Sequence, residues 1–154
     1  QFLRAWRTGN AQEYSDALRA AYYFTDVCVD HAVKAVRMHG FLEYGFSVPM
    51  NRMQASIAAY LETGDEYLLQ TAQAVTANSY WTHKNSWPRL AVGRDACFVR
   101  SAALLYRYFA IDFFRHIARE GAGAARKPLQ RGGFQLGAVR FARAVPRDAQ
   151  RLTP

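Results

Sequence analysis

The sequence predicts an all-α protein built from repeated antiparallel helical hairpins. Apolar residues recur at helical spacing through residues 1–120, no comparable alternating strand pattern appears there, and similar short joints separate successive helical segments. With 154 residues, of which 51% are hydrophobic and 21% charged, the chain is long enough for one folded domain with a substantial core.

Five segments carry the apolar spacing of one buried helix face, and together they account for the helices in order. A helix of this kind buries residues three and four positions apart along the chain. In chain order the five sets are Tyr14, Ala17, Leu18, Ala21 and Tyr22; Met53, Ile57, Tyr60 and Leu61; Tyr67, Leu68, Thr71, Ala72 and Val75; Phe98, Ala102, Leu105 and Phe109; and Phe113, Phe114, Ile117 and Ala118.

The joints between paired helices are alike. Gly9 and Gly64 each stand where a helix favours a left-handed C′ residue, and a residue that can cap the next helix follows each glycine. At the first joint Asn10 and Glu13 form a capping-box pattern. Residues 60–72 align without a gap on residues 106–118, so the hairpin repeats at about 50 residues. At the third joint Ala110 replaces the glycine, at a cost of about 1 kcal/mol in a left-handed turn, which makes this turn a candidate for remodelling.

The charge divides the chain into a helical domain, residues 1–120, and a basic tail, residues 121–154. The whole chain has a formal net charge of +8, but the tail holds seven basic side chains and one acidic one. Hydrophobic periodicity fades in the tail, and prolines interrupt it. A basic arm for nucleic acid is one interpretation; an adventitious end is the favoured one, because aromatic residues are few there, and nucleic acid is therefore an unlikely partner.

Several classes of protein and site are not indicated. No apolar run reaches the roughly 18 residues of a membrane span, so no membrane partner is expected. The two cysteines lack metal-site spacing and are predicted to be core thiols, and Asp26, Asp30 and His31 lack a further ligand at diagnostic spacing. Neither a metal nor another cofactor is predicted. The chain begins with Gln1 and carries no signal peptide pattern, so a missing N-terminus is expected and the localisation stays unknown.

The repeated pattern resembles the (α/α)-toroid carbohydrate-active enzymes, which include polysaccharide lyases and six-hairpin glycoside hydrolases. The resemblance is carried by AAYLETGDEYLLQTA, residues 58–72, with weaker copies at residues 5–18 and 105–118. It implies an incomplete (α/α) toroid, because about two and a half hairpins are present where the family has about six. The chain would then be a fragment or a short relative of such an enzyme.

The resemblance also implies a site, because in that family the helix before the TGD turn begins at the substrate cleft. By position, the cleft-facing groups would be Asn51, Arg52, Arg94 and Asp95, although Asn51 and Asp95 are equally suited to capping helices. The loops that lead into these helices would form the walls, with His39, Tyr44 and His83 as candidates for moving protons, and Trp87 and Arg89 as candidates for binding sugar.

The function that follows from the resemblance is action on a uronate-containing polysaccharide or oligosaccharide, with lyase chemistry favoured over hydrolysis. Arginine binds a uronate carboxylate in bidentate fashion, and a histidine or tyrosine would remove the neighbouring proton. The alternative is a non-catalytic helical-hairpin scaffold that binds protein partners or self-associates, since an incomplete set of hairpins leaves apolar faces to cover. A homo-oligomer or a missing remainder of the chain would cover them.

Overall fold

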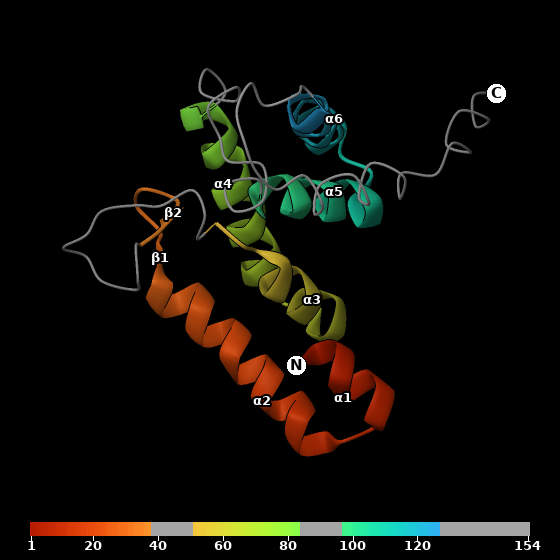
Figure 1. Ribbon diagram of the computed structural model, residues 1–154. Helices are drawn as coiled ribbons and strands as arrows, with labels where there is room; N and C mark the ends of the chain where they lie inside the picture. The colour runs from red at the N-terminus through yellow and green to blue at the C-terminus, as the bar shows by residue number, and fades with distance from the viewer. Residues whose placement is uncertain (38–50, 84–96, 127–154) are drawn as a thin grey trace, which may run out of the picture.

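A computed structural model describes residues 1–37, 51–83 and 97–126, and these residues form a mostly helical structure (Figure 1). The fold class predicted from the sequence is confirmed to that extent. The described helices pack as three sequential pairs, and neighbouring pairs contact each other. The helices are α1 (Phe2–Thr8), α2 (Ala11–Tyr23), α3 (Gln54–Thr63), α4 (Glu66–His83), α5 (Cys97–Phe109) and α6 (Asp112–Arg126).

The segment after α2 was not predicted from the sequence. It continues as a π-helix, η1 (Phe24–Cys28), and then forms a small antiparallel hairpin of β1 (Val29–Asp30) and β2 (Ala35–Val36). In this hairpin Val29 pairs with Val36, and both side chains are buried. The hairpin also contacts α4, where Asn78 Nδ2 donates to the carbonyl oxygens of Val33 and Lys34. Two residues per strand are too few for an alternating pattern to stand out in the sequence.

The three helix joints share one backbone geometry. Gly9, Gly64 and Ala110 have φ angles of 66°, 70° and 54°, all in the left-handed region. The N–H of each donates to the carbonyl oxygen four residues earlier, at 2.9, 2.7 and 2.8 Å respectively. The third turn is therefore not remodelled: it keeps the left-handed conformation although its residue is alanine.

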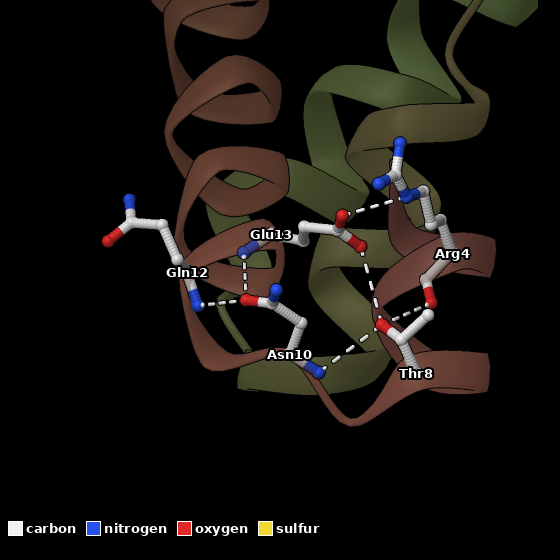
Figure 2. A network of polar contacts seen from close by, with 5 residues as sticks. All are labelled: Arg4, Thr8, Asn10, Gln12 and Glu13. Carbon is white, nitrogen blue, oxygen red and sulfur yellow. Dashed lines mark hydrogen bonds and ion pairs between the residues drawn. The ribbon is translucent and has the colours of Figure 1, made fainter.

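Figure 2 shows the polar network that fixes the first joint. Asn10 Oδ1 accepts hydrogen bonds from the backbone N–H groups of Gln12 and Glu13, at 2.9 and 3.1 Å, as the capping prediction requires. The Glu13 carboxylate takes a different partner from the one a capping box supplies: it pairs with Arg4 Nε at 2.7 Å and accepts from Thr8 Oγ1 at 3.3 Å. The capping-box prediction is thus half correct, and Glu13 ties α2 to α1.

The shared geometry predicts opposite effects for two substitutions. Ala110→Gly should stabilise the protein by about 0.5 to 1 kcal/mol, because it relieves left-handed strain of about 1 to 2 kcal/mol and adds a smaller cost in unfolded-chain entropy. Gly64→Ala should destabilise it by about 1 kcal/mol. An added Cβ at Gly64 meets no atom within 4 Å, so the cost is conformational and not steric. Urea denaturation of both variants measures this, and a less stable Ala110→Gly protein would contradict the argument.

The core divides into two clusters. The larger is built mainly from α3 to α6 and β1 and β2, and it includes Phe98, Met53 and Ile57, each at most 1% exposed. The smaller joins α1 and α2 to α3 and α4 through Phe2, Ala17, Ala21, Ala59 and Leu68. Most of the predicted helix-face residues are buried, but Leu61 and Tyr67 are 43% and 39% exposed. Both cysteines are unpaired thiols and partly buried.

Candidate functional site

The starts of α3 and α5 are hydrogen-bonded to each other. Gln54 Nε2 donates to the carbonyl oxygen of Cys97 at 3.2 Å, and the N–H of Met53 donates to Ser101 Oγ at 3.1 Å. Ser101 is fully buried and Met53 is 0% exposed, so these contacts belong to the packed interior. We call Met53, Gln54, Cys97 and Ser101 the helix-start junction. In it the starts of α3 and α5 are neighbours, and the family resemblance implies that these two helix starts share a cleft.

Asn51 connects this junction to the β-hairpin and to α4. Its side chain is 4% exposed, its Oδ1 accepts from the N–H of Val36 at 3.0 Å, and its Nδ2 donates to Ser79 Oγ. Ser79 in turn donates to the carbonyl oxygen of Val75 at 2.7 Å. The interpretation of Asn51 as a helix cap is wrong, because the residue at the N-cap of α3 is Met53. The side-chain amide of Asn51 instead joins three segments of the chain.

The structure describes three of the nine predicted site residues. Asn51 is buried, Arg52 is exposed and lies two residues before Gln54 of the junction, and His83 is the last residue of α4. The other six lie outside the described residues: His39, Tyr44, Trp87, Arg89, Arg94 and Asp95. Arg94 and Asp95, which are predicted to share a cleft with Asn51 and Arg52, are thus not described. The structure shows only that Gln54 and Cys97, which follow these two segments in the sequence, lie together.

A second group of polar residues lies where η1 meets α4, and the sequence did not indicate it. The Tyr67 hydroxyl donates to Asp26 Oδ1 at 2.6 Å, and the Tyr67 hydroxyl oxygen lies 3.1 Å from His31 Nε2. The rings of His31 and Tyr67 stack, with centroids 5.6 Å apart and planes 30° apart. We call Asp26, His31 and Tyr67 the Tyr67 cluster. All three side chains are exposed, so a ligand in solvent can reach them.

Two tyrosine–carboxylate pairs join the segment formed by α2 and η1 to the N-terminal end of α4. Tyr22 of α2 donates to Asp65 Oδ2 at 2.7 Å, while Tyr67 of α4 donates to Asp26 in η1. Asp65 also caps α4, because its Oδ1 accepts from the N–H of Tyr67 at 3.0 Å. The hydrogen bond to Asp65 is the main cause that raises the pKa of Tyr22.

Desolvation, followed by the hydrogen bond to Asp26, raises the pKa of Tyr67 to about 12. The folded state therefore favours the neutral phenol more than the unfolded state does. The resulting stabilisation is complete below pH 10, the unfolded value, and is lost as pH rises through about 12. At neutral pH the Tyr67 hydroxyl keeps its proton and acts as a hydrogen-bond donor to Asp26.

Asp30 does not join Asp26, although their spacing would place them on one face of an α-helix. Asp30 Oδ1 accepts from the N–H groups of Ala32 and Val33, both at 3.0 Å, and its other oxygen pairs with Arg37 at 3.4 Å. The backbone hydrogen bond from Val33 is the main cause that lowers the pKa of Asp30. Within residues 1–37, 51–83 and 97–126, no group of three or more His, Cys, Asp or Glu residues could hold a metal ion.

The sequence could not reveal the Tyr67 cluster, because its members are far apart along the chain. His31, in a turn, is 36 residues from Tyr67, and Asp26, in the π-helix, is 41 residues from it. The only available signal was the clustering of Asp26 and His31 near the end of an amphipathic helix.

None of the helices in the described part of the chain is long and apolar enough to cross a membrane. No family model, no curated protein and no solved structure matches this chain.

Proposed function

We propose that this chain is a fragment or short relative of an (α/α)-toroid carbohydrate-active enzyme and that it binds uronate-containing saccharides beside the helix-start junction. One observation supports the proposal most directly: the starts of α3 and α5 are joined by the bonds from Gln54 to Cys97 and from Met53 to Ser101. In the proposed enzyme class these helix starts face the substrate cleft. A shared cleft needs the two helix starts to be neighbours, and these hydrogen bonds support that part of the proposal.

The charge near the junction suits an anionic sugar. Arg52 is exposed two residues before Gln54, and Arg94 precedes Cys97 by three residues in the sequence. A guanidinium group binds a carboxylate through two parallel hydrogen bonds. Two such groups would hold the uronate carboxylate and neutralise the charge that develops when the neighbouring proton is removed.

Lyase chemistry is the favoured reaction. It removes the proton next to the carboxylate and expels the glycosidic oxygen, which leaves an unsaturated sugar. In the proposal His39 or His83 acts with Tyr44 to move protons, Trp87 stacks on a sugar ring, and Arg89 and Asp95 complete the binding surface. The internal hydrogen bonds of Asn51 indicate that it positions Arg52 through the backbone.

We expect uronate oligosaccharides to bind and Arg52→Ala to weaken that binding by roughly tenfold to a hundredfold, the effect of losing a charged hydrogen-bonding partner. Isothermal titration calorimetry with oligogalacturonate measures it. Arg7→Ala is the matched control, because Arg7 is an exposed arginine on α1 and should leave the affinity unchanged. A neutral oligosaccharide of the same length tests for charge recognition. Equal affinities for Arg52→Ala and the unmodified protein would refute the proposed site.

The reaction type is tested separately. Release of an unsaturated product that absorbs in the near ultraviolet would identify a lyase, whereas new reducing ends without that absorbance would identify a hydrolase. The second candidate function is a scaffold that self-associates, which the exposure of two large apolar side chains on α1 favours, Leu3 at 64% and Trp6 at 47%. Light scattering that gives an assembly mass, combined with no saccharide binding, would favour the scaffold.

A further inference from the structure

The Tyr67 cluster fixes which ring nitrogen of His31 carries the hydrogen. His31 Nε2 lies 3.0 Å from the carbonyl oxygen of Thr25 and 3.1 Å from the Tyr67 hydroxyl oxygen. A carbonyl oxygen can only accept a hydrogen bond, so Nε2 must be the donor. A neutral imidazole carries one ring hydrogen, and Nδ1 therefore has a free lone pair. His31 is an exposed residue.

The remaining members of the cluster hold this arrangement. The single Nε2 hydrogen of His31 is shared between the Thr25 carbonyl oxygen and the Tyr67 oxygen, and the Tyr67 hydroxyl donates its own hydrogen to Asp26, which gives a chain from imidazole to phenol to carboxylate. Ring stacking of His31 on Tyr67 fixes the orientation of the imidazole plane. In a catalytic triad a carboxylate orients the catalytic histidine and stabilises its charged form. Here Asp26 is the carboxylate, and the Tyr67 phenol lies between it and His31.

The surroundings leave room for a ligand. Tyr67 is 39% exposed, and the same chain segment as Asp26 presents two apolar side chains to solvent, Tyr23 at 63% and Val27 at 41% exposure. The π-helix that carries Asp26 is a rare element that often marks functional sites.

We propose that His31 is a proton acceptor for a hydroxyl-bearing ligand or for water, with Tyr67 and Asp26 as positioning residues. In the step, the proton of the hydroxyl group moves to Nδ1 and the electron pair stays on the oxygen of the ligand. The imidazolium formed keeps its Nε2 hydrogen bond to the Thr25 carbonyl and to Tyr67, which in turn donates to Asp26. This proposal does not depend on the saccharide site at the helix-start junction.

The tautomer is the first test, and it needs no variant. Long-range proton–nitrogen NMR correlations of the imidazole of the unmodified protein, recorded where His31 is neutral, should show the hydrogen on Nε2. In Tyr67→Phe the hydrogen should remain on Nε2, because the Thr25 carbonyl still accepts it. A hydrogen on Nδ1 in the unmodified protein would overturn the proposal.

The second test measures whether the lone pair is available, with 4-nitrophenyl acetate as the probe. Nδ1 attacks the acetyl carbon, the bond to 4-nitrophenolate breaks, and water then hydrolyses the acetyl-imidazole. His31→Gln should lower the rate of 4-nitrophenolate release by roughly tenfold, and Tyr67→Phe should lower it by a smaller factor. His116→Gln is the matched control and should leave the rate unchanged. A rate that His31→Gln does not lower, in a protein whose circular dichroism is preserved, would overturn the proposal.

Discussion

Replacing Phe98 by alanine should lower the free energy of unfolding by about 3 to 5 kcal/mol. Phe98 is 0% exposed and belongs to the larger core cluster, to which α3, α4 and α6 also contribute side chains. The substitution removes most of an aromatic side chain and leaves a cavity that the surrounding helices can only partly close. Domains are commonly stable by about 5 to 15 kcal/mol, so the loss would be a large part of the total.

Urea denaturation followed by circular dichroism measures the effect of Phe98→Ala. Tyr108→Ala is the control on the same helix, because Tyr108 is 51% exposed, and it should change the stability by no more than about 1 kcal/mol. Similar losses for the two variants would mean that Phe98 is not enclosed as described. The contrast matters for the proposed function, since α5 begins at the helix-start junction.

Replacing Asn51 by alanine should cost about 2 to 4 kcal/mol, the second-largest effect that we expect. The variant leaves the N–H of Val36 and the hydroxyl of Ser79 without the partner that the buried amide supplies. A buried polar group that loses its hydrogen bond keeps the full cost of desolvation. Ser79→Ala should cost less, because the bond from Val36 to Asn51 survives in that variant.

A double-mutant cycle of Asn51 and Ser79, measured by urea denaturation, isolates the energy of their contact. A positive coupling energy is expected. The loss of less than about 0.5 kcal/mol in Asn51→Ala would show that this amide does not join the β-hairpin to α4. The same variants separate stability from ligand binding: a folded Asn51→Ala protein that retains uronate affinity would assign Asn51 a structural role alone.

The helices and their joints could be predicted from the sequence because their signals are local. Apolar spacing and a glycine before a capping residue act over a few residues, and they locate α2 to α6 and the turns at Gly9 and Gly64. The conformation at Ala110 was not predictable in the same way. Local preference disfavours it, and the packing of α5 on α6 selects it nonetheless.

The polar contacts could not be predicted, because residues far apart in sequence form them. Asn51 and Ser79 are 28 residues apart, and Tyr67 and Asp26 are 41 apart. The residue types alone do not show which of two distant residues will pair, because only the fold brings the partners together. The resemblance pointed to the chain segments at the helix starts, and in the structure Gln54 and Cys97, which lie next to those segments, are hydrogen-bonded. The roles of the side chains in that site remain a proposal.

The helix-start junction also bears on how the protein opens transiently. Within a hairpin, helices contact near neighbours in the chain, and such units can unfold locally without the rest. The bonds from Gln54 to Cys97 and from Met53 to Ser101 cross from the second hairpin to the third, and the larger core cluster covers both. These two hairpins should therefore open as one cooperative unit, while α1, held by the smaller cluster, opens at a lower free energy.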